Sequence, residues 1–146
     1  MNIRSVLVVC TGNICRSPFA QTFLANSLPR LVVDSAGTHA PSNQPADSVV
    51  TGMAQEHGLD LSMHRSKAVS AELLHQHDLI LVMENDHAQS VELYSPEVRG
   101  RVMLLGHWNN RREIPDPFQR SIDMYSAVFS QLIGDAQGWV RKLSHS

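Results

Sequence analysis

The chain has 146 residues, of which 42% are hydrophobic and 18% are charged, and its formal net charge is −2. These values are typical of one globular domain that can bury a core without disulfide bonds, and we expect that domain to span residues 1–146. The nearly balanced charge excludes a strongly basic chain. We therefore expect neither nucleic acid nor an anionic membrane as the main partner.

The two cysteines, Cys10 and Cys15, lie close together in the chain. A disulfide framework spreads its cysteines to close long loops, and these two do not. Residues 1–5 lack the architecture of a signal peptide, and the apolar runs are too short to cross a membrane. We expect a protein of the reducing cytoplasm without stable membrane insertion.

Four short apolar runs predict strands, at residues 6–9, 31–33, 79–83 and 102–105. They are continuous rather than alternating, which is typical of parallel strands buried on both faces. Helical spacing follows each of them, at residues 17–28, 45–57, 71–77, 86–94 and 122–143. Gly134 and Gly138 weaken the prediction that the last helix is continuous.

This alternation predicts an α/β fold: a single domain with a doubly wound, four-stranded parallel sheet and helices on both faces. Ligands of such folds bind at the carboxyl ends of strands. The first predicted strand ends at Cys10, so a phosphate-binding loop after strand 1 would lie where the architecture places a site. Two long irregular stretches, residues 37–45 and 106–120, are further candidates for functional residues.

The loop after the first strand reads Cys10-Thr11-Gly12-Asn13-Ile14-Cys15-Arg16-Ser17. A cysteine, five residues, an arginine and a serine form a signature of cysteine-based phosphatases. A tight curl can direct successive backbone N–H groups at a phosphate dianion, and Gly12 and Asn13 tolerate the torsions that a curl needs. Ser17-Pro18 predicts an N-cap and the first helical position, so the helix would direct its positive end at the loop.

The same surroundings act on the Cys10 thiol. Backbone N–H groups, a helix N-terminus and an arginine favour the thiolate, which is the form that attacks phosphorus. Arg16 can form a fork with two phosphate oxygens, and Ser17 is near enough in sequence to donate a hydrogen bond to the sulfur. Each residue alone could be a buried cysteine, a turn or a cap. Their combination predicts a nucleophile in a phosphate-binding loop.

A departing alkoxide or phenoxide also needs a proton. Among the 14 acidic residues Asp116 has the most suggestive setting, because Pro115 and Pro117 stiffen the chain around it. Phe118 could line the mouth of the cleft. Asp-Pro is also a frequent turn pair, so the residues alone leave Asp116 open as an acid or as a turn residue.

Together these motifs resemble the low-molecular-weight protein tyrosine phosphatases. The resemblance rests on residues 9–18 and 116–118, with further matches at 34–38, 64–66 and 81–83, and it covers nearly the whole chain. In the larger tyrosine phosphatases the acid loop precedes the cysteine loop, which is the opposite order. Residues 106–108 followed by 114–117 resemble a bacterial branch that is associated with exopolysaccharide or capsule production.

The resemblance implies a protein-tyrosine-phosphatase that forms a phosphocysteine and needs neither a metal nor another cofactor. Cys10 is then the nucleophile, Arg16 binds the phosphoryl group, and Asp116 is the general acid and later the general base. The implied phosphate-binding loop also contains Thr11, Gly12, Asn13, Ile14, Cys15 and Ser17. Cys15 matches a cysteine that can form a protective disulfide with Cys10.

The resemblance also implies supporting residues and partners. His64 matches the histidine that braces Asn13, and Phe118 is an aromatic wall of the substrate cleft where many relatives have tyrosine. Residues 38–45 contain no aromatic, unlike many eukaryotic relatives, so the substrate grip there should differ. Trp108 either lines the cleft or packs. The implied partner is a phosphotyrosine protein such as a bacterial tyrosine kinase, and we expect a monomer.

Two other functions compete with this interpretation. An arsenate reductase resembles this fold and uses a similar loop, but its disulfide relay needs further cysteines and none follows Cys15. A phosphate- or phosphopeptide-binding module without turnover would be expected to have lost the nucleophile, the arginine or the candidate acid. Cys10, Arg16 and Asp116 are all present, which favours an enzyme.

Overall fold

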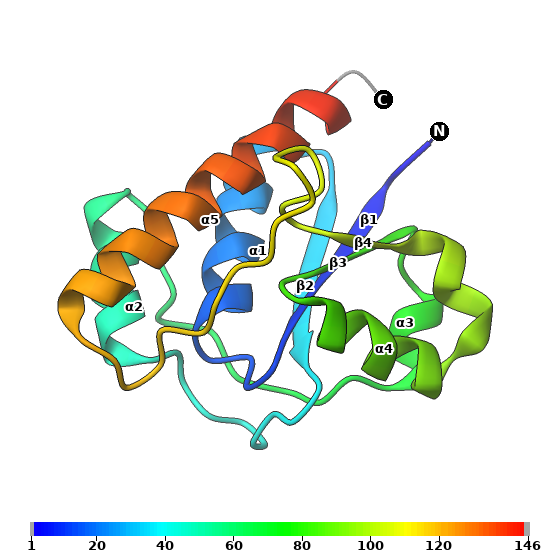
Figure 1. Ribbon diagram of the computed structural model, residues 1–146, viewed down its shortest axis with the longest axis horizontal. Coiled ribbons are helices and arrows are strands. Elements are labelled where there is room, and N and C mark those ends of the chain that lie inside the picture. The colour runs from blue at the N-terminus through cyan, green and yellow to red at the C-terminus, as the bar shows by residue number, and fades with distance from the viewer. Residues whose placement is uncertain (1, 145–146) are drawn as a thin grey trace.

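The computed structural model describes residues 2–144 of the chain. Its centre is a four-stranded parallel sheet with the strand order β2-β1-β3-β4 (Figure 1). The strands are β1 (Ser5–Cys10), β2 (Val32–Gly37), β3 (Leu79–Val82) and β4 (Val102–Leu104). The predicted α/β class and all four strands are confirmed.

Five α-helices and one 3-10 helix connect and follow these strands within the described residues. They are α1 (Arg16–Ser27), α2 (Ser48–Glu56), α3 (Ala71–His75), α4 (Asn85–Tyr94), η1 (Pro96–Arg101) and α5 (Ile122–Leu143). The last helix is continuous in spite of its two glycines, because its apolar stripe is buried against the core along its length.

The central strand β1 is buried on both sides. Val6 and Val8 belong to the core cluster that includes residues of α1, α2 and α5. Leu7 and Val9 belong to the cluster that includes residues of α3, α4 and η1. Figure 1 shows these two helical layers on opposite faces of the sheet. Burial on both faces explains why the strand has no polar alternation.

The position of β1 places a ligand site at its carboxyl end. After β1 the chain first adds β2 on one side and later adds β3 on the other, so the strand order reverses between β1 and β3. Ligands of open α/β sheets bind in the crevice at such a point. β1 ends at Cys10, and α1 begins at Arg16, directly after the loop that fills this crevice.

The prediction that Ser17 is the N-cap of α1 is wrong. The helix begins at Arg16, the N-cap residue is Cys15, and Ser17 lies in the first turn. Its hydroxyl does not cap the helix because it contacts Cys10 Sγ and Asn13 Nδ2 instead. Pro18 still lies in the first turn, where a missing backbone N–H costs nothing.

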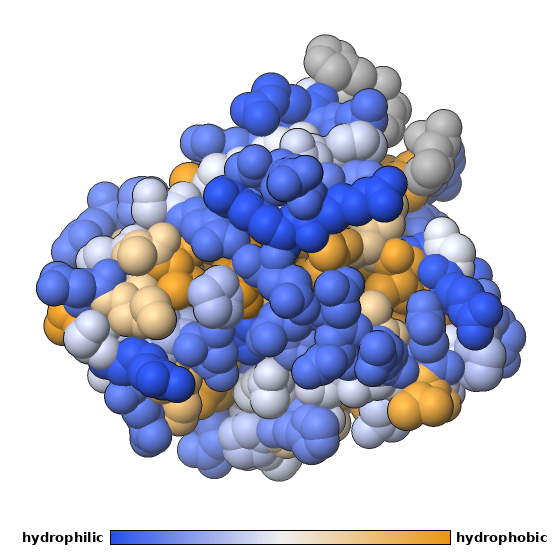
Figure 2. Space-filling model, in the orientation of Figure 1, coloured by the Kyte–Doolittle hydropathy of each residue, from blue (hydrophilic) through white to orange (hydrophobic). Residues whose placement is uncertain are grey.

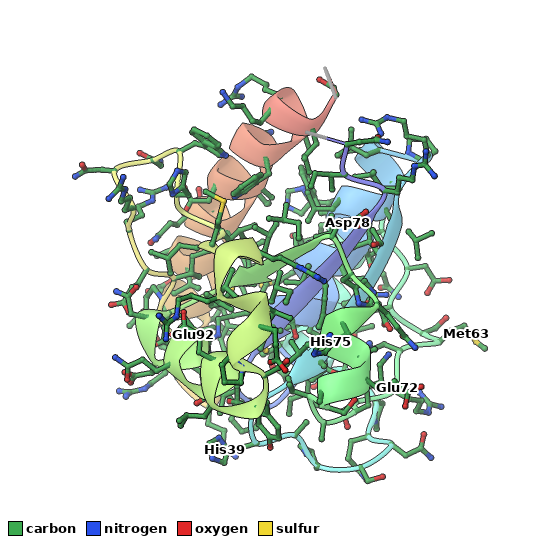
Figure 3. All side chains as sticks on the ribbon, turned by 90° about the vertical axis from the view of Figure 1, so that its right-hand side faces the viewer. His39, Met63, Glu72, His75, Asp78 and Glu92 are labelled. Carbon is green, nitrogen blue, oxygen red and sulfur yellow. The ribbon has the colours of Figure 1, made fainter. Side chains whose placement is uncertain are left out.

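The face of the molecule in Figure 2 is mostly hydrophilic. On the side shown in Figure 2, apolar residues form small patches between hydrophilic ones. On the α3 and α4 side, Glu72 and His75 lie on the exposed side of α3 (Figure 3). None of the helices in residues 2–144 combines the length and hydrophobicity that a membrane crossing needs.

Candidate active site

The loop between β1 and α1 turns on one residue with a left-handed backbone. Asn13 has a φ of 55° and is fully buried, as its residue type allows. The sequence also suggested unusual torsions at Gly12, but Gly12 is not among the residues with positive φ. The strained position of the loop is therefore Asn13.

Polar contacts satisfy the side chain and the backbone carbonyl of Asn13. Its Nδ2 donates to Ser17 Oγ at 2.8 Å and to Ser35 Oγ at 2.9 Å, and its Oδ1 accepts from the Lys67 N–H at 3.0 Å. Its backbone carbonyl lies 2.6 Å from His64 Nε2. A carbonyl only accepts, so His64 carries a proton on Nε2. These contacts hold the loop from its outer side.

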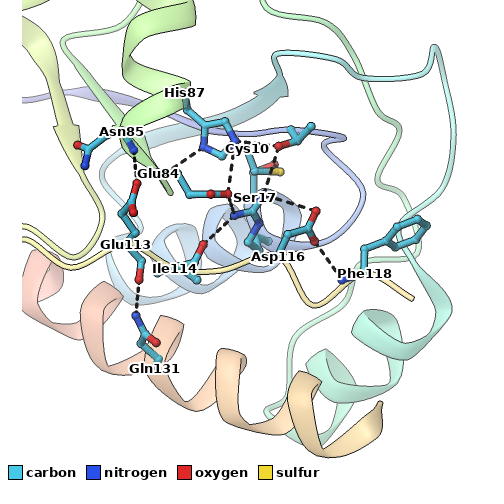
Figure 4. A network of polar contacts seen from close by, with 12 residues as sticks. Cys10, Ser17, Glu84, Asn85, His87, Glu113, Ile114, Asp116, Phe118 and Gln131 are labelled. Atoms are coloured by element: carbon cyan, nitrogen blue, oxygen red, sulfur yellow. Dashed lines mark hydrogen bonds and ion pairs between the residues drawn. The ribbon is translucent and has the colours of Figure 1, made fainter. Parts of the chain in front are cut away.

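The thiol of Cys10 lies at the base of the loop and is 1% exposed. Its Sγ is 2.9 Å from Ser17 Oγ (Figure 4). Because Asn13 Nδ2 can only donate to Ser17 Oγ, the serine proton is free to donate to the sulfur. Cys15 is also a buried free thiol, and burial raises the pKa of Cys15 well above its ordinary value. Cys15 is thus held in its protonated form.

The guanidinium of Arg16 connects three segments and is 1% exposed. Its Nη1 donates to Glu84 Oε2 at 2.5 Å and to the Ile114 carbonyl at 2.7 Å (Figure 4). Its Nη2 donates to Thr11 Oγ1 at 3.3 Å. Arg16 Nε is buried and has no hydrogen-bond partner within residues 2–144. A buried donor without a hydrogen-bond partner is rare in a folded protein, which indicates that a bound group supplies the acceptor.

The segment that carries Asp116 is anchored at its start. The Ile114 N–H donates to the Met83 carbonyl at 2.9 Å. Glu113 Oε2 accepts from the Asn85 N–H at 2.7 Å, and the Glu113 carbonyl accepts from Gln131 Nε2 at 2.7 Å (Figure 4). The segment is therefore tied to the end of β3, the start of α4 and the middle of α5.

Asp116 lies next to Arg16 although a hundred residues separate them in sequence. Its Oδ2 is 3.8 Å from Arg16 Nη2, and its Oδ1 accepts from the Phe118 N–H at 3.0 Å. The side chain is 45% exposed. The local turn formed with Phe118 fixes the carboxyl group over the loop while leaving it in reach of solvent.

Cys10, Arg16 and Asp116 line one pocket of about 350 Å³. The complete lining is Cys10, Thr11, Gly12, Ile14, Cys15, Arg16, Pro41, Asp116 and Phe118. Three further predicted residues, Asn13, Ser17 and His64, do not line it and instead support the loop. Pro41 is the lining residue that comes from segment 38–45, which contains no aromatic residue.

A second pocket of about 370 Å³ lies between α2 and α5. It is slightly larger, but it has neither a cysteine nor an arginine in its lining, which includes His57 and Phe129. Its residues offer no nucleophile next to an anion-binding group. In residues 2–144 no cluster of three or more histidine, cysteine, aspartate or glutamate side chains could hold a metal ion.

Trp108 packs and does not line the cleft. Its ring centroid is 5.4 Å from that of Trp139, and Lys142 Nζ lies 4.5 Å from its centroid. It covers Gly138, where an added Cβ would lie 3.4 Å from Trp108 Cβ. The alternative left open by the sequence is therefore decided in favour of packing against α5.

Sequence reasoning missed two residues behind the loop, Glu84 and His87. Glu84 accepts from Arg16, and His87 Nε2 lies 2.8 Å from Thr11 Oγ1. His87 is 4% exposed, and burial, followed by the charge of Arg16, lowers its pKa to about 4. Glu84 was detectable as an acidic residue at the carboxyl end of a predicted strand. His87 carried no signal, because its contact with Thr11 depends on the tertiary fold.

Comparison with known proteins gives a consistent result. Residues 5–146 match the family model of low molecular weight phosphotyrosine protein phosphatases. The chain is 42% identical to the low molecular weight protein-tyrosine-phosphatase Etp of Escherichia coli, over 99% of this chain and 97% of that protein.

Solved structures agree with the sequence comparison. The crystal structure of the tyrosine phosphatase AmsI of Erwinia amylovora has a TM-score of 0.95 and 43% identity, over 98% of this chain and 95% of that one. The crystal structure of the tyrosine phosphatase Wzb of Escherichia coli in complex with sulphate has a TM-score of 0.94 and 39% identity, over 97% of this chain and 99% of that one. The chain belongs to the low molecular weight phosphotyrosine protein phosphatases, which are cysteine-dependent hydrolases.

Proposed function

We propose that this phosphatase hydrolyses phosphotyrosine in proteins through a phosphocysteine formed on Cys10. The observation that carries the proposal is Arg16 Nε, a buried donor without a partner in residues 2–144, in the pocket that Cys10 and Asp116 also line. An unsatisfied buried donor is costly, and an oxygen of a phosphoryl group bound there would satisfy it. Arg16 is the phosphoryl-binding residue.

In the first step Cys10 Sγ attacks phosphorus, and the bond from phosphorus to the tyrosine oxygen breaks. The electron pair of that bond goes to the oxygen, and Asp116 supplies the proton that makes it a neutral phenol. The exposure of Asp116 and its distance from Arg16 support this role, because the carboxyl can reach the leaving oxygen above the bound phosphoryl group.

In the second step water attacks the phosphocysteine, and Asp116 takes a proton from that water. The bond from phosphorus to sulfur breaks, and the thiolate of Cys10 leaves with inorganic phosphate as the product. The hydroxyl of Ser17, 2.9 Å from the sulfur, stabilises the returning negative charge. Asn13 and His64 keep the loop in shape during both steps.

The walls of the pocket favour an aromatic ester. Phe118, Ile14 and Pro41 are apolar lining residues, whereas Cys10 at the base is 1% exposed. A tyrosine ring can span this depth and contact Phe118 on the way. We expect a phosphoserine side chain, which is shorter, to bring its phosphorus to the buried sulfur less readily. The relatives Etp and Wzb are named protein-tyrosine-phosphatases.

The first experiment measures phosphate release from phosphotyrosine and phosphoserine peptides, with EDTA present. We expect turnover of phosphotyrosine alone in the wild type and none in Cys10→Ser. The matched control is Cys15→Ser, which changes the other thiol of the same loop and should keep most of the activity. Turnover by Cys10→Ser, or none by a folded and reduced wild type, would refute the proposal.

We further propose that the substrate protein is an autophosphorylated bacterial tyrosine kinase of exopolysaccharide synthesis or export. The phosphatase would act on it as a monomer in the cytoplasm. The proposal rests on the resemblance to the exopolysaccharide-associated branch and on the relatives Wzb, Etp and AmsI. The test compares kcat/KM for that kinase, purified from the same organism, with kcat/KM for a phosphotyrosine peptide of its own sequence. Equal values would argue against a dedicated kinase partner.

A further inference from the structure

The ring of His87 is held in one tautomer. Its Nδ1 lies 3.1 Å from the backbone nitrogen of Glu84, which can only donate. Nδ1 must therefore accept, and the proton of the neutral ring is on Nε2. The neutral ring is the stable form because burial and the charge of Arg16 lower the pKa of His87 to about 4. His87 thus presents a fixed Nε2–H donor.

The hydroxyl of Thr11 accepts from two donors. His87 Nε2 lies 2.8 Å from Thr11 Oγ1, and Arg16 Nη2 lies 3.3 Å from the same oxygen. A threonine hydroxyl has two acceptor lone pairs and one proton. Both lone pairs are occupied, so the hydroxyl proton must point in the remaining direction. Within residues 2–144 no acceptor for this proton is found among the hydrogen bonds of Thr11.

Thr11 lines the pocket together with Cys10, Arg16 and Asp116. We propose that Thr11 is a further phosphoryl-binding residue, whose hydroxyl donates a hydrogen bond to an oxygen of the bound phosphoryl group, and that His87 is the positioning residue that fixes this direction. The inference rests on the proposed phosphatase function. It assigns phosphoryl binding to the side chain of Thr11, in addition to the backbone N–H groups of the loop. It adds a neutral donor next to the charged guanidinium.

The first test compares Thr11→Val with Thr11→Ser. Valine has nearly the shape of threonine and lacks the hydroxyl, whereas serine keeps it. A hydrogen bond to a charged group contributes roughly 1.5–3 kcal/mol, so Thr11→Val should weaken binding of inorganic phosphate and lower kcat/KM by about tenfold to a hundredfold. Thr11→Ser keeps the hydroxyl and should lose much less of both than Thr11→Val does. Phosphate binding by Thr11→Val at wild-type strength would overturn the inference.

A second pair of variants tests His87. Glutamine is the residue of an ordinary capping box, so its amide oxygen can still accept from the Glu84 N–H. Its amide nitrogen can then donate toward Thr11, whereas leucine can form neither contact. We expect His87→Leu to weaken phosphate binding and His87→Gln to restore it. The nitrogen chemical shifts of His87 in the wild type should report a proton on Nε2. A proton on Nδ1 would overturn the inference.

The double variant Thr11→Val/His87→Leu separates direct donation from mere support of the fold. Replacing both partners of a buried hydrogen bond by apolar groups is nearly neutral for stability. The double variant should therefore regain thermal stability relative to Thr11→Val, whereas its phosphate binding should remain as weak. Recovery of phosphate binding would mean that Thr11 acts only through its neighbours and would overturn the proposed donation.

Phosphate binding is measured by calorimetry without any turnover. Failure of the phosphatase function would appear as a lack of phosphotyrosine hydrolysis by the wild type. Failure of this inference would appear as unchanged phosphate binding in Thr11→Val with hydrolysis by the wild type intact. The two failures are therefore distinguishable.

Discussion

Gly37 shows how closely the sheet and the loop between β1 and α1 approach each other. A Cβ added at Gly37 would lie 2.4 Å from the Thr11 carbonyl and 2.8 Å from Ala40 Cβ. The first of these is backbone of the loop, which cannot move without displacing its neighbours. The Gly37 N–H also donates to the Lys67 carbonyl, so the strand end is held on its other side.

We therefore expect Gly37→Ala to displace the loop and to lower kcat/KM strongly, with a reduced thermal midpoint. The control is Gly52→Ala in α2, where no atom lies within 4 Å of the added Cβ. Alanine in a helix interior is favoured over glycine by about 0.5–1 kcal/mol, so this control should be neutral or slightly stabilising. Wild-type kinetics in Gly37→Ala would contradict the close approach.

Asp116 gives a second prediction at the level of one residue. Asp116→Asn keeps the size of the side chain and an oxygen that accepts from the Phe118 N–H, but it cannot donate a proton as an acid does. General acid catalysis contributes about 10²–10⁴-fold, and a good leaving group needs it least. Measured kcat should therefore fall most for substrates with poor leaving groups. Equal losses over a series of leaving groups would argue against the acid role.

Among the elements, the strands and helices were largely predictable from the sequence, and the reasons are physical. The runs around Val6–Val9 and Leu79–Met83 are continuous because both faces of the sheet are covered, and the last helix has its apolar residues at helical spacing. The start of α1 was misplaced because local capping preference favours Ser17. The contact of Ser17 with the sulfur of Cys10, which is tertiary, overrides it.

The candidate site could be assembled from the sequence only where its residues are neighbours in the chain. Cys10 and Arg16 lie in one motif, and a buried strand before it and a helix after it set its position. Asp116 was ambiguous on local grounds and depended on the resemblance. Glu84 and His87 were missed because they act through contacts across the sheet, which no local pattern encodes.

One connection between elements supports a third prediction. Asp135 in α5 has a fully buried carboxylate that accepts from Arg112 Nη2 at 2.8 Å, from Arg112 Nε at 3.0 Å and from Asn109 Nδ2 at 3.1 Å. Arg112 is 41% exposed. The contact ties the segment before Ile114 to the helix.

Removing the two partners of this pair should have unequal effects. Arg112→Met leaves a buried carboxylate without its charge partner. Breaking a fully buried pair in this way costs about 3–5 kcal/mol, and the loss here should be smaller because Arg112 is partly exposed and Asn109 still donates to the carboxylate. Asp135→Leu leaves a guanidinium that can turn to water, so its cost should be smaller. The measurement is the free energy of unfolding from urea titration. A larger loss in Asp135→Leu than in Arg112→Met would contradict the argument.

At the scale of the whole molecule, the buried histidine ties stability to pH. The pKa of His87 falls to about 4 from an ordinary value of 6.5, with burial as the main cause and Arg16 as the second. Glu84, Asp86 and Asp116 oppose the shift without cancelling it. Burial also lowers the pKa of His64. Between the folded and unfolded pKa values the unfolded chain binds more protons than the folded chain, so stability rises with pH there.

We expect the free energy of unfolding to decrease as pH falls from about 6.5 to about 4, and one such histidine contributes a slope of at most about 1.4 kcal/mol per pH unit. In His87→Gln the side chain does not titrate, so that part of the slope should disappear while the part from His64 remains. The measurement is urea unfolding at a series of pH values for wild type and variant. A slope that is identical in the two proteins would mean that His87 titrates alike in the folded and unfolded chain, and the predicted link between this histidine and stability would be wrong. The Nε2–H donor itself is tested separately, because it rests on the contact of Nδ1 with the Glu84 N–H.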